Sequence, residues 1–380
     1  MAKFVSFIAL LFLILSNQLI TYAEEKQALE IKSEAAVLMD SETGAVLYDK
    51  NSEEKLYPAS LTKIASAIYA IENANLEDVV TVSSRAVNED GTKVYLEEGE
   101  KVPLKKLIQG MLINSGNDAA VAIAEHVDGS VEQFAKNMNV YLKEKVGVRD
   151  THFTNPNGLF DENHYTTALD LALITNYAKK NPVFSEIFRT KELDWIGKSW
   201  QTTILTHHRL LKGEIPFEGI TGGKTGFVNE SKHTLATTAE NDKIKLTAIV
   251  LKADSSNESY DDTENLIDYG LKNFHHRVVK QNELFTVEEK IYHTKTNTLV
   301  TEHINGSEQD ITKNGVLEVM NDGQVIQSLQ LEVKEPKHVS IKEEKELASE
   351  KSSFNIFLGI IFFAFAGVFL GVRKKLVRKQ

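Results

Sequence analysis

One segment near the end of the chain limits where the rest can fold: the run Phe354 to Val372 contains no charged side chain. As a helix, these 19 residues would be roughly 28 Å long, enough to cross the hydrocarbon core of a bilayer. Basic residues follow directly, and such residues beside a membrane span stay in the cytoplasm. The alternative, a buried core helix, fits poorly with a terminal position and a basic tail. We therefore predict a transmembrane helix over residues 354–372 and a cytoplasmic tail over 373–380.

The other end of the chain has the features of a secretory signal. Lys3 precedes the apolar run Phe4 to Ile14, and Thr21-Tyr22-Ala23 stands before Glu24. A basic start, an apolar centre and small residues before a cleavage site are typical of a signal peptide. An uncleaved N-terminal anchor is the alternative. We predict a signal peptide over residues 1–23, so the folded body should lie outside the cell, anchored by its C-terminal helix.

Between these ends, the apolar pattern predicts an α+β domain over residues 24–274. Runs typical of strands occur early and late: Ala35–Asp40 and Ala45–Asp49, then His233–Ala239 and Leu246–Lys252. Helical periodicity occurs in six segments: Ile64–Ile71, Leu104–Ile113, Asp118–Val127, Val131–Val146, Thr167–Lys180 and Tyr260–Phe274. Strands at both ends with helices between them predict a sheet that pairs distant segments.

The character of the sequence changes near His275. Alternating apolar residues are interrupted there by three pairs that are strong turn signals: Asn305-Gly306, Asn314-Gly315 and Asp322-Gly323. This pattern predicts a small all-β domain over residues 275–341. The next residues are rich in Lys, Glu and Ser and lack aromatic side chains, which predicts a charged linker over 342–353.

Composition excludes several classes of chemistry. The chain has no cysteine, so a disulfide framework, a thiolate metal site and a cysteine nucleophile are impossible. The formal net charge of −11 argues against a nucleic acid partner, whose phosphates need a basic surface. The pair His207-His208 invites a zinc site, but no carboxylate or further histidine stands at motif spacing. We therefore expect no metal and no other cofactor.

Three short motifs occur in order: Ser60-Leu61-Thr62-Lys63, Ser115-Gly116-Asn117 and Lys224-Thr225-Gly226. An S-x-x-K, S-x-N and K-T-G series is typical of penicillin-binding proteins and class A β-lactamases. Each motif alone is weak, because Ser52-Glu53-Glu54-Lys55 and Ser255-Ser256-Asn257 match by chance. Context separates them. Ser52 lies in a charged run that we expect to be solvated, whereas Ser60 opens an apolar helix.

The S-x-x-K motif supplies a serine with a base. Residues three apart on a helix share a face, so Lys63 can reach the Ser60 hydroxyl. The N-terminus of the helix favours negative charge that develops there. A serine is a poor nucleophile until a neighbour takes its proton, and Lys63 can take it only when neutral. Burial and a nearby cation, for which Lys224 is the candidate, would both lower the Lys63 pKa. In isolation, Ser60 would be interpreted as a plain helix cap.

The other two motifs supply groups for a substrate. Ser115 and Asn117 follow an apolar helix, where polar groups can line a cleft: the hydroxyl can relay a proton, and the amide can bind a substrate amide. Lys224 and Thr225 can hold a substrate carboxylate, and Gly226 lets a substrate backbone run close beside an edge strand. Taken singly, the S-x-N motif fits a helix-end cap and turn better than a functional role, and the K-T-G motif fits a glycine-rich hairpin turn equally well.

Taken together, these motifs resemble those of the low-molecular-mass penicillin-binding proteins that are D-alanyl-D-alanine carboxypeptidases. The resemblance runs from about Ala35 to Phe274. Besides the three motifs, it rests on three stretches within this range: Tyr57–Lys63, Phe153–Leu159 and His164–Ala168. It implies a β-lactamase/transpeptidase-like fold, in which helices flank an antiparallel sheet, followed by a small β domain and a membrane anchor. The segment Thr206-His207-His208-Arg209 departs from the Asn-x-Asn pair of many relatives.

The resemblance also implies a role for each motif residue. The implied catalytic residues are Ser60 as the acylated nucleophile, Lys63 as its base, and Ser115. The implied substrate-binding residues are Asn117, Lys224, Thr225, Gly226 and Phe227. Lys224 and Thr225 would bind the terminal carboxylate of D-Ala-D-Ala. The backbone N–H groups of Ser60 and Phe227 would form an oxyanion hole.

The implied reaction is a hydrolytic acyl transfer on the peptidoglycan stem peptide. Ser60 attacks the carbonyl of the penultimate D-Ala of a stem pentapeptide, the terminal D-Ala leaves, and water releases the acyl-enzyme. β-Lactams imitate the substrate and acylate Ser60. The β domain and the membrane span argue against a β-lactamase. A non-hydrolysing sensor of β-lactams or stem peptides, and an endopeptidase that cuts crosslinks, share the same motifs and stay open at this point.

Overall fold

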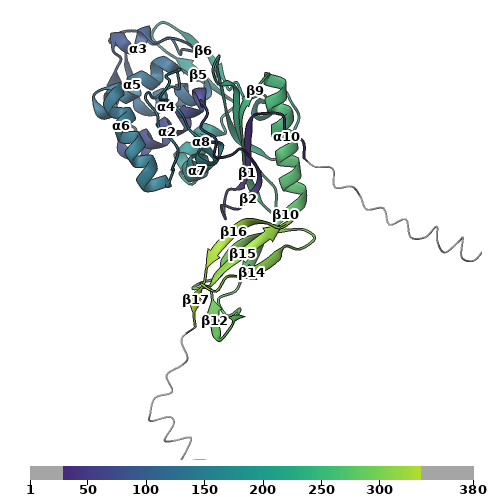
Figure 1. Cartoon of the computed structure of the whole chain (residues 1–380). Helices are drawn as coiled ribbons and strands as arrows, with labels where there is room; N and C mark the ends of the chain where they lie inside the picture. Colours follow the sequence, from purple (N-terminus) through teal and green to yellow (C-terminus); the bar gives the residue numbers. More distant parts are fainter. Residues whose placement is uncertain (1–28, 335–380) are drawn as a thin grey trace, which may run out of the picture. The chain divides into compact units, whose positions relative to one another are not determined.

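A five-stranded antiparallel sheet forms the centre of the structure, with strand order β2-β1-β9-β8-β7 (Figure 1). Its strands are β1 (Ala35–Asp40), β2 (Val46–Lys50), β7 (Ile220–Val228), β8 (Lys232–Glu240) and β9 (Lys245–Ala253). The early strand β1 lies between β2 and the late strand β9, and Val37 is opposite Ile249. The predicted α+β class and the pairing of distant strands are therefore confirmed.

The computed structural model describes residues 29–334. The predicted signal peptide over 1–23, the linker over 342–353, the span over 354–372 and the tail over 373–380 all lie outside the described residues. Within residues 29–334, no helix is long and apolar enough to cross a membrane.

Helices cover both faces of the sheet, with α10 (Ser256–Asn273) on one face and the remaining long helices on the other (Figure 1). These are α2 (Thr62–Asn73), α4 (Leu104–Ile113), α5 (Asn117–Asp128), α6 (Val131–Tyr141) and α7 (Ala168–Lys179), with the shorter α3 (Ser84–Asn88) and α8 (Pro182–Phe188). The short α9 (Arg209–Lys212) lies on the α10 face, where Arg209 lies over the ring of Tyr260. Because both faces are covered, every residue of β1 is buried.

The predicted helices occur within a few residues of their expected bounds, but several short elements were not predicted. These are α3, α8, α9, the hairpin of β5 (Glu192–Ile196) with β6 (Gln201–Leu205), the pair β3 (Val79–Thr81) with β4 (Lys101–Pro103), and strand β7. Each is either too short to show a period or, in β7, so rich in glycine that it looks like a turn.

Helix α2 is buried all round. Its apolar residues repeat at helical spacing, which predicts one buried stripe, yet all residues from Thr62 to Ile71 are buried. The reason is its central place, since it contacts α4, α5, α6, α7 and α8. A helix that is enclosed in this way encloses its polar residues too, and Lys63 is one of them.

Strands fill the region after α10. Strand β10 (Phe274–Val279) pairs with β13 (Thr298–His303), and β14 (Glu308–Ile311), β15 (Val316–Asn321) and β16 (Gln324–Gln330) form a three-stranded sheet. Asp322 and Gly323 both have positive φ, as a two-residue type I′ hairpin requires. The predicted β character of this region is present, whereas its predicted domain boundary at residue 275 stays a prediction.

By its contacts, the described chain divides into two units. One contains residues up to 283 together with 294–331, and the other contains 284–293 together with 332–334. In the second unit, β11 (Phe285–Val287), β12 (Lys290–His293) and β17 (Glu332–Val333) form a small antiparallel sheet.

A loop at residues 154–159 packs against the turn in front of α2. The hydroxyl of Ser66 on α2 donates to the carbonyl oxygen of Pro156 at 2.6 Å, which fixes the loop. Gly158 has φ +84°, and a Cβ placed on it would overlap the carbonyl oxygen of Ala59. Only glycine therefore fits at this contact.

Replacing Gly158 by Ala should destabilise the protein by roughly 3 kcal/mol or more, because it adds a steric overlap to an unfavourable φ. The matched control is Gly129→Ala at the end of α5. This glycine has φ +80° but nothing within 4 Å of an added Cβ, so the cost should be only about 1–2 kcal/mol. Urea denaturation followed by tryptophan fluorescence measures both. Equal losses would show that the contact with Ala59 does not constrain residue 158.

Candidate active site

Ser60 lies in a single turn of 3-10 helix, Ala59–Leu61, immediately before α2. Ala59 has φ +49°, which is strained for a residue with a side chain. Its carbonyl oxygen accepts a hydrogen bond from Thr62 Oγ1 at 2.9 Å, and Thr62 Oγ1 lies 2.8 Å from His164 Nε2. The turn is thus held at its base by side chains, and Ser60 stands at the helix start as predicted.

His164 takes part in this support as a neutral ring. The backbone N–H of Thr154 donates to its Nδ1 at 3.0 Å, so the ring proton is on Nε2 and points to Thr62. Burial lowers the pKa of His164 to about 3, which keeps the ring uncharged at neutral pH. A neutral ring at this place adds no positive charge beside Lys63.

The amine of Lys63 is fully buried and has three partners. Its Nζ lies 2.9 Å from Ser60 Oγ, 2.7 Å from Asn117 Oδ1 and 2.7 Å from the carbonyl oxygen of Asn157. Burial lowers the pKa of Lys63 well below its ordinary value, and the charge of Lys224 lowers it further. A neutral amine in contact with the serine hydroxyl is the arrangement that a base requires.

Ser115 lies in the connection between α4 and α5, where its φ is +62°. Its neighbours hold it there: Asn117 N–H donates to the carbonyl oxygen of Thr92 at 2.7 Å. The buried carboxylate of Asp118 accepts the backbone N–H of Val94 at 3.0 Å. A strained residue that its surroundings fix in this way is common at functional sites.

The K-T-G motif lies inside strand β7, at the edge of the sheet, and not in a turn before the late strands. Lys224 is almost fully buried, and burial lowers its pKa to about 7. Its Nζ donates to Ser115 Oγ at 3.0 Å and to the carbonyl oxygen of Thr225 at 2.8 Å. The second and third motifs, far apart in sequence, are therefore in direct contact.

The edge strand also runs close to the nucleophile. A Cβ placed on Gly226 would lie 2.9 Å from the backbone nitrogen of Ser60, so this approach needs a glycine. Thr234 Oγ1 on the neighbouring strand β8 donates to the carbonyl oxygen of Pro58 at 3.0 Å and joins the sheet to the same turn. Ser60 is thus held between α2 and the sheet edge.

These residues meet at a hollow of about 350 Å³. The predicted site residues that line it are Ser60, Ser115, Thr225, Gly226 and Phe227. The other predicted residues are buried and contact this set: Lys63 contacts Ser60 and Asn117, and Lys224 contacts Ser115. Further lining residues are Thr92, His207, Arg209, His233, Thr234, Leu235, Ser256, Ser259 and Tyr260.

Several residues at this site were given no role from the sequence. Asn157 and His164 lie in stretches that carried the resemblance, but a contact through a backbone carbonyl or a buried ring has no sequence signal of its own. Arg209, which lines the hollow, lies over the ring of Tyr260 at 5.0 Å and donates to Asn257 at 2.9 Å. The only feature of the sequence that drew attention to Arg209 is its place in the segment Thr206–Arg209, which departs from the pattern of many relatives.

One expectation changes with the structure, that for Ser52, whereas His208 is a satisfied histidine. Ser52 is 1% exposed and not solvated as its charged neighbours suggested, because its hydroxyl bonds to the Asp49 carboxylate; Lys55 of that motif pairs instead with Asp150 at 3.0 Å. His208 is buried, and both its ring nitrogens are occupied, Nδ1 by the N–H of Leu211 at 3.1 Å and Nε2 by Thr237 Oγ1 at 2.8 Å.

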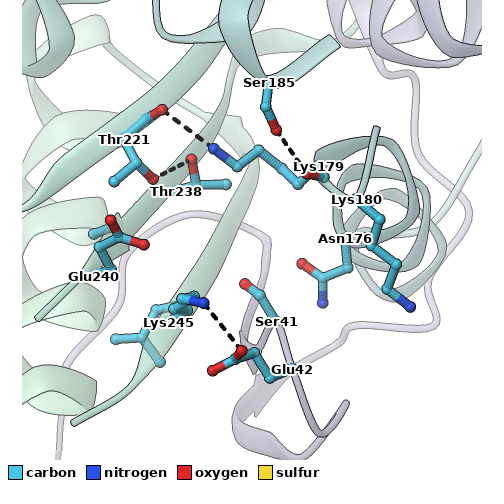
Figure 2. A pocket seen from close by; sticks show the side chains of 12 residues that line it. Ser41, Glu42, Asn176, Lys179, Lys180, Ser185, Thr221, Thr238, Glu240 and Lys245 are labelled. Atoms are coloured by element: carbon cyan, nitrogen blue, oxygen red, sulfur yellow. Dashed lines mark hydrogen bonds and ion pairs between the residues drawn. The ribbon is translucent and has the colours of Figure 1, made fainter. Parts of the chain in front are cut away.

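A second hollow, of about 470 Å³, lies between α7 and the other end of strands β7–β9 (Figure 2). Two of its three lysines already have partners: Lys179 Nζ donates to the carbonyl oxygen of Thr221 at 3.3 Å, and Lys245 pairs with Glu42 at 3.0 Å (Figure 2). Its lining contains no residue of the three motifs. The chemistry predicted from the sequence therefore belongs to the first hollow.

Comparison with known proteins points the same way. A family model described as D-alanyl-D-alanine carboxypeptidase matches residues 21–255. The D-alanyl-D-alanine carboxypeptidase DacF of Bacillus subtilis is 33% identical over 288 residues, which cover 71% of this chain and 73% of that protein.

Solved structures are similar as well. Penicillin binding protein 5 from Haemophilus influenzae aligns with a TM-score of 0.68 at 25% identity over 80% of this chain and 97% of that one. Penicillin binding protein 6B from Escherichia coli gives a TM-score of 0.65 at 26% identity over 80% and 96%. By its sequence, its fold and the contacts among its three motifs, this chain belongs to the D-alanyl-D-alanine carboxypeptidase family.

Proposed function

We propose that this protein is a serine carboxypeptidase that removes the terminal D-Ala of peptidoglycan stem pentapeptides outside the cell through an acyl-enzyme on Ser60. The observation that carries the proposal is the buried Lys63 amine, 2.9 Å from Ser60 Oγ, at a hollow that Ser115 and Thr225 also line. Membership of the family supports the reaction class.

The partners of Lys63 determine where its lone pair points. A neutral amine has two N–H donors and one lone pair. The carbonyl oxygen of Asn157 and Oδ1 of Asn117 can only accept, so they take both N–H groups. The lone pair then faces Ser60, whose hydroxyl donates to it. As Ser60 Oγ attacks the substrate carbonyl, its proton passes to Lys63.

The K-T-G strand supplies the remaining functions. Burial lowers the pKa of Lys224 to about 7, and a substrate carboxylate that comes near would raise it again and favour the protonated form, because the two charges are opposite. This favours substrates with a free C-terminus. Backbone N–H groups of Ser60 and Phe227 would stabilise the oxyanion, and the close approach of β7 to Ser60 fits that arrangement.

Departure of D-Ala needs a proton on its amine. The proton that Lys63 took from Ser60 goes to this nitrogen, so Lys63 is neutral again, and Ser115 Oγ, which lines the hollow and contacts Lys224 at 3.0 Å, is placed to relay it. The ester on Ser60 then reacts with water, whose proton goes to Lys63 while its hydroxyl adds to the acyl carbonyl. Collapse of this intermediate restores the Ser60 hydroxyl and releases the shortened peptide. A β-lactam offers Ser60 a cyclic amide, and its opening should form an ester on the same oxygen.

We further propose that the signal peptide over residues 1–23 exports the chain and that the helix over 354–372 anchors it with the catalytic domain outside. The support is the charge-free run and the basic residues after it.

Replacing Ser60 by Ala should abolish covalent labelling by a fluorescent penicillin and lower D-Ala release by on the order of 10⁴-fold or more, because the acylated oxygen is gone. Ser52→Ala, in the chance copy of the motif, is the matched control and should keep both activities. Gel fluorescence and a D-Ala assay on a pentapeptide measure the two effects. Labelling that survives Ser60→Ala would disprove the assignment of the nucleophile.

Replacing Lys224 by Gln should lower kcat/KM about 10- to 100-fold for a peptide with a free C-terminus, since one charged hydrogen bond is lost. A peptide with an amidated C-terminus should already be a poor substrate of the unchanged enzyme, and the substitution should affect it less. If the unchanged enzyme cleaves the free and amidated peptides equally well, Lys224 does not recognise a carboxylate.

Ending the chain after Ser352 should release a secreted, soluble protein, because the charge-free run is removed. Its turnover of a small peptide should be near that of the full-length protein, since Ser60 and its partners lie far upstream. Activity on intact cell wall should fall, because the anchor keeps the site near its substrate. Cell fractionation with assays of both fractions tests this. A shortened protein that stays with membranes, or that is secreted but inactive on the peptide, would contradict a pure anchor role.

A further inference from the structure

We propose that the two loop residues Glu89 and Asp90, which belong to none of the three motifs, align the catalytic base, and that Glu89 is a positioning residue for acyl transfer to Ser60. Glu89 directly follows helix α3 as its C-cap residue, and neither residue was singled out from the sequence. The proposal rests on the function proposed above, because it concerns the step in which Lys63 takes the Ser60 proton.

The first contact runs from Glu89 through Asn157. The side-chain amide of Asn157 donates from Nδ2 to Glu89 Oε1 at 2.7 Å, and its Oδ1 accepts the N–H of Leu159 at 3.0 Å. A carboxylate only accepts and a backbone N–H only donates, so this orientation of the amide is the only one that fits. Asn157 is 1% exposed, so water cannot easily replace the carboxylate. Held at its side chain, Asn157 keeps its carbonyl oxygen 2.7 Å from Lys63 Nζ.

The second contact runs from Asp90 through Asn117. Asn117 Nδ2 donates to the backbone carbonyl oxygen of Asp90 at 2.6 Å, which turns Oδ1 toward Lys63. Were this amide reversed, its NH2 group would face Lys63 and would attract the lone pair of the neutral amine. Ser60 would then face an N–H donor and would have no base. The adjacent residues Glu89 and Asp90 therefore set both oxygen atoms that direct the lone pair at Ser60.

Glu89 also acts through its charge. The groups whose charge acts on Lys63 are Lys224 on β7, Asp118 at the start of α5 and Glu89 itself. His164 and His207 lie nearby, but burial lowers their pKa values to about 3 and about 4, so both are neutral. The Glu89 carboxylate raises the Lys63 pKa, against the larger effect of burial. Removing this charge should lower the Lys63 pKa, so the amine becomes neutral at a lower pH.

The test measures the rate of Ser60 acylation by a fluorescent penicillin across pH, using the full-length protein in detergent. Glu89→Gln keeps an acceptor oxygen for Asn157 but removes the charge. It should retain most of the rate at the optimum and move the acid limb of the profile to lower pH. Glu89→Ala removes the acceptor as well and should lower the rate at the optimum about tenfold or more, since small misplacements of a base are costly. Glu98→Ala, an exposed acidic residue of the same segment, is the control for charge and should match the unchanged protein.

Two outcomes would overturn the proposal. One is a Glu89→Ala protein with the unchanged rate and pH profile. The other is an equal loss in both Glu89 variants with no movement of the acid limb, which a merely structural role would produce. If Glu89→Ala does not fold, the position of the acid limb in the pH profile of Glu89→Gln alone decides whether the proposal stands. Failure of the unchanged protein to be labelled at Ser60 would instead refute the proposed function, so the two failures are distinguishable.

Discussion

The burial of Lys63 is the constraint on which the rest of the site depends. An ammonium group enclosed by a helix that is buried all round is unfavourable, and losing its proton is the least costly response. The same burial that would be a defect elsewhere therefore favours the neutral amine, which is the form that can act as a base. The neighbouring residues suit a neutral amine: His164 carries no charge, and oxygen atoms of Asn117 and Asn157 accept hydrogen bonds from Lys63 Nζ.

The second cation of the site illustrates the same balance. Lys224 is also buried, and its charge opposes a charge on Lys63, so the pair does not favour two ammonium groups together. Its contact with Ser115 nevertheless places it where a carboxylate can enter the hollow. A substrate carboxylate would stabilise the ammonium form of Lys224 and leave Lys63 neutral. On the proposed mechanism, substrate recognition and the activation of Ser60 would thus be coupled through the interaction between the two lysines.

Parts of the site were predictable because short motifs and periodic patterns in the sequence specify them. Ser60, Lys63, Ser115, Asn117 and Lys224 were predicted because short motifs retain their order along the chain, and the fold brings them into contact. The α+β class was predictable because strands and long helices have clear periods. Strand β7 was not, since Gly222, Gly223 and Gly226 give it the composition of a turn. Its strand character comes from pairing with β8, a long-range effect.

What local patterns could not show is the layer of contacts behind the motif residues. The support of Ala59 by Thr62 depends on the His164 ring, which is about a hundred residues away along the chain. The alignment of Lys63 depends on a backbone carbonyl and on the orientation of two amides. A hydrogen bond has a direction, and a motif specifies residue types without it. Catalysis by a neutral lysine requires that direction, because only one of the three positions around its nitrogen is a lone pair. On the proposed mechanism, the residues that set this direction would therefore belong to the active site as much as the lysine does.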